Sequence, residues 1–188
     1  MSRANGEKRC LILALGNDIL GDDAVALHLA RRLREVLPAS VDVIESAETG
    51  LSLLDFLVGY DSVFVLDAIE VERPDGRLRF ITGASSMPLL GGGVHFLGLP
   101  DVLHLCHALG LTTPARVMVV GIPIAPAREV REGLSPEVAM RLPEWTQSVR
   151  GLIEKHLSWY GDEGRGGEGY ESERRFANER GTGPIHQC

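Results

Sequence analysis

The sequence is poor in cysteine and aromatic residues, and it has no long apolar run. Its three cysteines are odd in number and widely spaced, and no two of them form a Cys-x-x-Cys pair. That pattern excludes a disulfide framework and indicates reduced thiols, as in the cytosol. Cys10 opens an apolar run and Cys106 lies in an apolar helical pattern, so we expect both to be small core residues.

A membrane segment and a secretory signal are both missing. The longest apolar runs, residues 11–15 and 63–66, fall far short of the roughly 20 residues that a spanning helix needs. Residues 1–9 are polar with mixed charge, which is not the layout of a signal peptide. We therefore expect a cytoplasmic protein without a membrane partner.

Clustered positive charge is also absent. The chain carries 19 Lys and Arg residues against 26 Asp and Glu residues, for a formal net charge of −7. Binding to a phosphate backbone requires grouped cations, and this sequence has no basic run. Nucleic acid is therefore excluded as an expected partner.

Glycine divides the chain into a body and a tail. A length of 188 residues suits one domain with an appendage. Seven of the 22 glycines fall within residues 160–188, a segment without apolar periodicity. Its few apolar side chains cannot offset the entropy of ordering it. We predict a flexible N-terminus over 1–8, a single α/β domain over 9–159 and a disordered, glycine-rich tail over 160–188.

Short apolar runs alternate with longer amphipathic ones in the body of the chain. Continuous apolar runs predict strands buried on both faces at residues 10–15 and 62–68, where the run lasts until Asp67. Further strands are predicted at residues 41–44 and 116–121. Apolar residues spaced three to four apart predict helices over 22–37, 50–58, 99–109 and 135–157. Alternation over residues 77–82, behind a hairpin-type turn at 74–76, predicts an edge strand. This succession predicts a three-layer α/β/α sandwich around a twisted, largely parallel sheet of about five strands.

Acidic residues and a histidine lie where such a sheet binds its ligands, beyond the carboxyl ends of the strands. Asp23 follows the first predicted strand, Asp67 ends the third, and His95 lies in a loop beside three consecutive glycines. If the three converge, two carboxylates and one imidazole form a set that accepts nickel or zinc and leaves positions open. Ligands from three separate loops also make a weak, exchangeable site.

Ordinary structural roles remain open for these residues. Asp22, at the start of a predicted helix, is expected to cap that helix. The negative charge of Asp23 can interact favourably with the dipole of the same helix. Asp67 can hold an adjacent loop, although a buried strand end is a costly place for an unpartnered carboxylate. Taken by itself, His95 is a loop histidine that indicates no particular function. The other histidines of the body are expected on helix faces: His28, His104 and His107.

Three other kinds of site fit the sequence poorly. The loop after the first strand lacks the spacing of a phosphate-binding loop, and its aspartates repel phosphate. A phosphorylation-receiver domain needs a lysine after the last strand, whereas the two lysines here are Lys8 and Lys155. It stays a distant alternative. No Gly-x-Ser-x-Gly motif or interpretable Cys/His pattern supports a nucleophile.

Collinear motifs over about residues 9–157 resemble the hydrogenase maturation proteases, the endopeptidases that trim the C-terminal extension from [NiFe]-hydrogenase large subunits. The matching segments are Leu13-Ala14-Leu15-Gly16-Asn17, Leu20-Gly21-Asp22-Asp23, Glu48-Thr49-Gly50, Leu66-Asp67-Ala68, His95-Phe96-Leu97-Gly98-Leu99, Gly121-Ile122-Pro123 and Gly133-Leu134-Ser135-Pro136. The last of these marks the start of the final helix, with Ser135 as N-cap and Pro136 in the first turn.

The resemblance implies a phosphorylase/hydrolase-like fold and a metal-dependent endopeptidase. Three residues of the family bind nickel carried by the substrate, and they map onto Asp23, Asp67 and His95. The nickel is supplied by the large-subunit precursor rather than held tightly by the free protein, which we expect to be a monomer. Hydrolysis then proceeds by metal-assisted activation of either the scissile carbonyl or a water molecule.

The chain departs from the family pattern at two positions and in the glycine-rich tail after Trp159, which matches nothing in the family. The first ligand is often Glu, whereas Asp23 is one methylene shorter. The second helix usually begins with Asp-Gly-x-Thr-x-Gly, whereas residues 45–50 read Glu-Ser-Ala-Glu-Thr-Gly, which leaves substrate contacts of that loop open. A module that checks nickel or escorts the large subunit without cutting it is the alternative function.

Overall fold

The computed structural model describes residues 9–82, 99–126 and 130–162. The chain divides into two compact units, residues 1–152 and 153–188. The N-terminus predicted over 1–8 and nearly all of the predicted tail lie outside the described residues, so both stay predictions. No helix in the described ranges is long and apolar enough to span a membrane.

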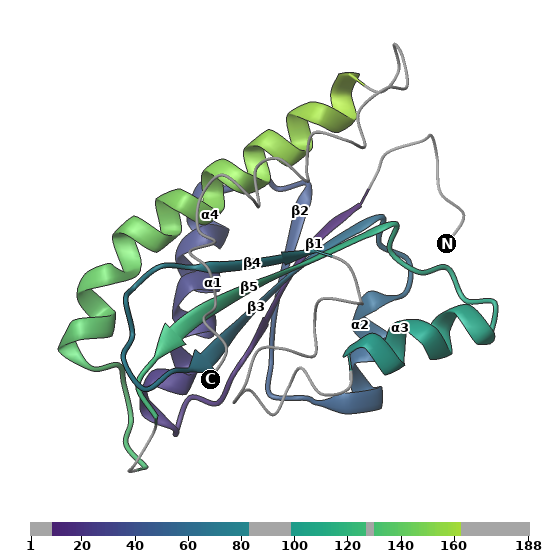
Figure 1. Ribbon diagram of the computed structural model, residues 1–188. Helices are drawn as coiled ribbons and strands as arrows, with labels where there is room; N and C mark the ends of the chain where they lie inside the picture. Colours follow the sequence, from purple (N-terminus) through teal and green to yellow (C-terminus); the bar gives the residue numbers. More distant parts are fainter. Residues whose placement is uncertain (1–8, 83–98, 127–129, 163–188) are drawn as a thin grey trace, which may run out of the picture. The chain divides into compact units, whose positions relative to one another are not determined.

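A five-stranded sheet forms the centre of the first unit, with the strand order β2-β1-β3-β5-β4 (Figure 1). The strands are β1 (Cys10–Leu15), β2 (Val41–Ser46), β3 (Ser62–Glu70), β4 (Arg79–Thr82) and β5 (Arg116–Ile124). Neighbouring strands are parallel except β4, which pairs antiparallel with β5 at one edge. The largely parallel sheet of five strands predicted from the sequence is therefore confirmed.

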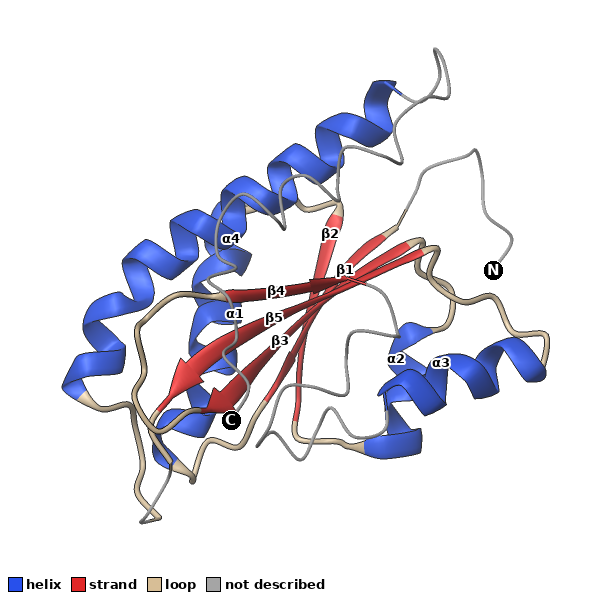
Figure 2. Cartoon of the chain, in the orientation of Figure 1, coloured by secondary structure: helices blue, strands red, loops and turns tan. Residues whose placement is uncertain are grey.

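Helices lie on both faces of this sheet. They are α1 (Val25–Val36), α2 (Leu54–Leu57), α3 (Leu99–Ala108) and α4 (Pro136–Asp162), with the 3-10 turns η1 (Gly21–Ala24) and η2 (Gly50–Leu53). In Figure 2, α1 and residues 136–152 of α4 lie on one side of the strands, while α2 and α3 lie on the other. The three-layer α/β/α arrangement predicted from the sequence is confirmed.

The core explains why β1 and β3 read as continuous apolar runs. Every residue of β1 is buried, because helices cover both faces of the central strands. On the α2 and α3 side, one cluster joins the sheet to these helices through Leu11, Leu13, Leu15, Val63, Val65, Leu53, Leu57, Leu99, Val102 and Cys106. Each fully buried leucine contributes about 1.5–3 kcal/mol to stability. Cys10 and Cys106 are buried free thiols, as expected.

Strand β2 is two residues longer than predicted. Strands β3 and β5 are also longer, because they pair with each other beyond the end of β1. Leu66 in β3 is the last partner of β1, at Ala14. Pairing with β5 then continues from Asp67 and Gly121 to Glu70 and Ile124. The prediction that Asp67 ends its strand is therefore wrong: Asp67 lies within β3, level with the point where β1 stops.

The turn before the edge strand was also interpreted incorrectly. Near residues 74–76, Arg77 N donates to Asp75 Oδ1 at 3.0 Å and Gly76 has φ of 72°. However, β5 lies between β3 and β4, so the turn does not close a hairpin. Local turn chemistry could not reveal this, because the strand inserted there comes more than 30 residues later in the chain.

Candidate functional site

The candidate site lies where the chain reverses its direction of winding across the sheet. From β1 the chain moves to β2 on one side, and it then returns to β3 on the other side of β1. The carboxyl ends of β1 and β3 therefore flank the switch point, where open α/β sheets bind ligands. The turn η1, which follows β1, packs against β3 at this place.

Asp67 is the one fully buried acidic residue among the described parts of the chain. Its side chain has no exposed surface, and neither carboxylate oxygen has a hydrogen-bond partner among the described residues. Burial raises the pKa of Asp67 to about 8, the negative charge of Asp23 adds to the rise, and the backbone amide of Ala68 opposes it. A buried polar group without a partner is costly, so Asp67 is a candidate for a residue that binds a ligand.

Asp23 reaches this place because the chain turns tightly after β1. Its Oδ2 atom accepts a hydrogen bond of 2.9 Å from the backbone N–H of Asn17. A Cβ atom at Gly16 would lie 2.6 Å from the carbonyl oxygen of Asp23, so only glycine permits this close approach. Asp23 and Asp67, predicted from separate loops, are therefore neighbours.

Asp22 does not cap its own helix, which corrects the expectation from sequence. No side chain caps η1 or α1. Instead, Asp22 Oδ1 accepts a hydrogen bond of 2.6 Å from Ser135 N, and Asp22 Oδ2 accepts one of 2.8 Å from Ser135 Oγ. Ser135 Oγ accepts in turn from Val138 N at 3.3 Å, which confirms Ser135 as the cap of α4.

His95, the third predicted ligand, lies outside the described residues. Within the described ranges, no three His, Cys, Asp or Glu side chains are grouped as a metal site. The structure thus brings together two of the three predicted residues. His104 and His107 are exposed on α3 and His28 is half-buried on α1, in agreement with their predicted surface positions.

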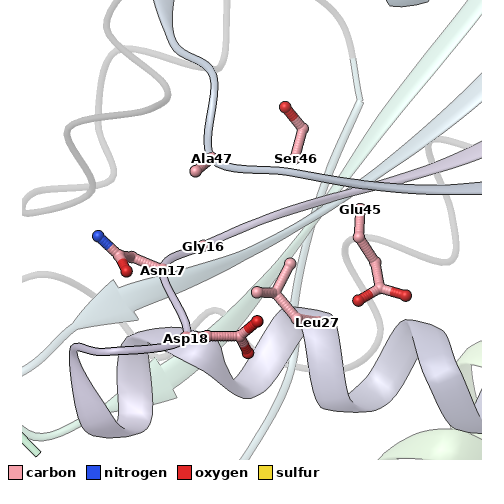
Figure 3. A pocket seen from close by; sticks show the side chains of 7 residues that line it. All are labelled: Gly16, Asn17, Asp18, Leu27, Glu45, Ser46 and Ala47. Carbon is pink, nitrogen blue, oxygen red and sulfur yellow. The ribbon is translucent and has the colours of Figure 1, made fainter. Parts of the chain in front are cut away.

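An open cavity of about 290 Å³ lies beside the turn after β1. Its lining comes from that turn, from the end of β2 with the residue after it, and from α1, and consists of Gly16, Asn17, Asp18, Leu27, Glu45, Ser46 and Ala47 (Figure 3). In Figure 3, the carboxylates of Asp18 and Glu45 lie on the side of the β2 chain where Leu27 lies, and Ser46 points the other way.

Arginines from α1 already neutralise the acidic side chains of this cavity. Arg31 donates to Glu45 at 2.7 Å and to Asp18 at 3.0 Å, and Arg34 donates to Glu45 at 2.9 Å. The two carboxylates are therefore matched by two guanidinium groups. Asp23 and Asp67, in contrast, have no arginine partner among the described residues. Sequence spacing gave no sign of the bridging role of Arg31.

The donor set at the switch point suits a divalent cation. Two carboxyl groups offer oxygen ligands, and their mutual repulsion in a buried place is relieved when a cation binds between them. A histidine on a neighbouring loop would complete an oxygen, oxygen and nitrogen set of the kind that accepts nickel or zinc. The observed residues therefore fit a metal.

Comparison with known proteins identifies the family. A sequence model described as hydrogenase maturation protease matches residues 24–151, beginning one residue after Asp23. The chain is 30% identical over 152 residues to the hydrogenase 2 maturation protease of Escherichia coli, covering 78% of this chain and 92% of that protein. It is 25% identical over 172 residues to the hydrogenase expression/formation protein HupD of Bradyrhizobium diazoefficiens, covering 79% and 85%.

Solved structures show the same architecture. The hydrogenase maturating endopeptidase HybD from Escherichia coli superposes with a TM-score of 0.66 at 25% identity, covering 79% of this chain and 93% of that one. The [NiFe] hydrogenase maturation protease HybD from Thermococcus kodakarensis gives a TM-score of 0.56 at 26% identity, covering 77% and 98%. Because sequence and fold agree over most of its length, the chain belongs to the hydrogenase maturation protease family.

Proposed function

We propose that this protein is an endopeptidase that removes the C-terminal extension of a nickel-loaded [NiFe]-hydrogenase large-subunit precursor. Asp23, Asp67 and His95 bind the nickel carried by that precursor. The metal belongs to the substrate, so the free protein needs no tightly held ion. The buried free thiols of Cys10 and Cys106 fit an enzyme that works in the reducing cytoplasm, and we propose that it acts there as a monomer.

The single observation that carries the proposal is the state of Asp67. Its carboxyl group is buried, lacks a hydrogen-bond partner among the described residues and has a pKa raised to about 8 beside a second acid. A purely structural aspartate at this position would be expected to pair with an arginine or another cationic side chain. An acid left in this state, in a chain of this family, fits a binding site for a cation that arrives from outside.

The chain's own residues then organise the cleavage. Asp23 and Asp67 bind the metal end of the precursor and thereby place the adjacent peptide bond at the switch point. A nickel ion held there supplies Lewis acidity, to either the scissile carbonyl or a water molecule. Because Asp67 is largely protonated near neutral pH, its carboxyl group gives up a proton when it binds the cation.

The test is cleavage of a nickel-loaded precursor by the full-length protein. Incubation should release a short C-terminal peptide, seen as a mass decrease of the large subunit. Asp67→Asn and His95→Ala should each lower the cleavage rate by at least 100-fold, because each removes a proposed ligand. Full activity in either variant would refute the site assignment.

Matched variants separate loss of chemistry from general damage. His104→Ala and Asp101→Asn change the same residue types at exposed positions of α3, and they should cleave like the wild type. A precursor without nickel should stay uncut. An unchanged mass with a verified nickel-loaded precursor and folded protein would instead favour the escort module, which binds the precursor without cutting it.

A further inference from the structure

We propose that Asp22 and Ser135 are positioning residues that fix the carboxylate of Asp23 at the switch point. This inference deepens the proposed function, since it concerns how one of the proposed nickel-binding residues is held. It rests on the contacts that surround η1, which come from a part of the chain more than 100 residues away.

The contact between Asp22 and Ser135 is bidentate and shielded. Asp22 accepts from Ser135 N at 2.6 Å and from Ser135 Oγ at 2.8 Å. The Asp22 side chain is 17% exposed, and Arg131 Nη2 lies 3.6 Å from its Oδ1 atom. Hydrogen bonds to a carboxylate are about twice as strong as those between neutral groups. This side chain therefore ties η1 to the first turn of α4.

The turn η1 has little to hold it by itself. It is four residues long and no side chain caps its start at Leu20. Its other outside support is the segment before α4, because Gly21 N donates to Arg131 O at 2.7 Å and Leu20 forms a parallel bridge to Arg131. The segment around 131–135 thus fixes the direction in which the turn leaves β1.

These contacts determine the position of Asp23. It directly follows Asp22 in the turn, and its Oδ2 atom accepts from the N–H of Asn17 at 2.9 Å on the β1 side. Gly16 allows the Asp23 backbone to lie close against the end of β1. If the Asp22 contact is lost, only the backbone contacts of Leu20 and Gly21 with Arg131 join η1 to the segment before α4. The Asp23 carboxylate is then held less firmly beside Asp67.

The test uses variants of the full-length protein and two readouts that do not need the precursor. Hydrogen exchange of the Asn17 amide reports the position of the Asp23 carboxylate, because that carboxylate accepts its proton. Titration with Ni²⁺ ions alone reports the affinity of the metal site. Asp22→Ala and Ser135→Ala should each speed Asn17 exchange by at least tenfold and weaken Ni²⁺ binding by about 10–100-fold. Exchange at Val65, within β3, should stay unchanged.

Two comparison variants distinguish positioning from loss of stability. Ser135→Thr keeps both donors and should behave like the wild type. Trp145→Phe removes the bond of 2.8 Å from Trp145 Nε1 to Gly76 O, which loosens α4 at a place remote from η1. It should lower the melting temperature while leaving Asn17 exchange and Ni²⁺ affinity as they are.

The outcomes separate this inference from the proposed function. Asn17 exchange at the wild-type rate in both Asp22→Ala and Ser135→Ala would overturn the positioning role, whatever the metal does. Asp23→Ala provides the reference, because it removes the acceptor itself and should give the fastest Asn17 exchange. If Asp23→Ala binds Ni²⁺ as the wild type does, the proposed nickel site is wrong, while the exchange data still decide how Asp23 is held.

Discussion

At the scale of single residues, the carboxyl group of Asp67 dominates the electrostatics of the site. It lies within β3 among apolar neighbours, with the charge of Asp23 nearby, and its pKa is raised to about 8. The free protein near neutral pH therefore holds Asp67 largely as the neutral acid. A cation bound between the two groups would counteract both burial and the repulsion from Asp23, because it stabilises both carboxylates at once.

This pKa predicts how stability changes with pH in the free protein. The folded pKa, about 8, lies above the ordinary value of 3.8, so the folded state binds the extra proton between these values. The free energy of unfolding should therefore fall as pH rises from about 4 to 8, by up to about 1.4 kcal/mol per pH unit from this group. Urea unfolding at several pH values measures it.

The variant Asp67→Asn isolates this contribution, since its amide stays neutral throughout. Its free energy of unfolding should lack the decline and exceed that of the wild type most at pH 8. Equal slopes for the two proteins would contradict the raised pKa. Saturating Ni²⁺ should reverse the trend in the wild type, because metal binding favours the ionised carboxylate.

Sequence position identified some of these residues but not their partners. Asp23 and Asp67 could be nominated because each follows or lies within a buried strand near its carboxyl end. Ser135 could be identified as a cap from the proline after it. The contact of Asp22 with Ser135 could not, because it joins residues 113 positions apart and local capping rules favoured the helix next to Asp22. His95 lies outside the described residues, so its role stays a prediction.

At the scale of elements, the turn between β1 and η1 depends on glycine at position 16, which has no side chain. A methyl group at Gly16 would collide with the Asp23 carbonyl oxygen, which belongs to the backbone and has little room to yield. Gly16→Ala should therefore destabilise the protein by about 1–3 kcal/mol, because the turn has to shift. It should also reduce precursor cleavage, since the Asp23 carboxylate moves with the turn. Thermal unfolding and the cleavage assay measure the two effects.

A second glycine in a helix provides the matched control. Gly151 lies within α4, and a Cβ atom there would have no neighbour within 4 Å. Gly151→Ala should raise stability by up to about 1 kcal/mol through helix propensity alone. If Gly16→Ala is as well tolerated as Gly151→Ala, the close approach at Gly16 does not hold in solution.

The elements themselves could largely be predicted, and their ends could not. Continuous apolar runs located the central strands β1 and β3, since burial on both faces leaves a strong pattern. Alternation located the edge strand β4, whose residues are half-buried or exposed. Strand β3 extends past Ala68, because β5 supports it there, and no local signal encodes that partner. The helix predicted over 50–58 begins as the 3-10 turn η2 and continues as the short α2, since apolar spacing alone does not distinguish these forms.

At the scale of the whole molecule, the working part of the chain should end with α4. The residues after Asp162 are rich in glycine and charge and carry no apolar periodicity. We predict that a chain ending at residue 162 keeps the melting temperature and the cleavage rate of the full-length protein. Calorimetry and the precursor assay compare the two lengths. A loss of more than a few degrees or of activity would show that the tail contributes to the folded enzyme.

The order of the strands in the sheet could not be predicted from the sequence. Alternating strands and helices predicted a parallel sheet, because crossover connections of this length favour parallel neighbours. The insertion of β5 between β3 and β4 depends on which edge the last strand meets, and that is decided by packing rather than by local residues. Because of this insertion, β4 pairs with a strand that follows it by more than 30 residues.

That strand order limits when each contact can form while the chain is being synthesised. The edge strand β4, at residues 79–82, pairs only with β5 at residues 116–124, so it leaves the ribosome well before its partner exists. The contact of Asp22 closes later still, once residue 135 has emerged. A growing chain therefore exposes an unpaired strand and an unfixed Asp23 until most of the protein has been made. If Asp23 acts as proposed, the protein can cut a substrate only once residue 135 has emerged.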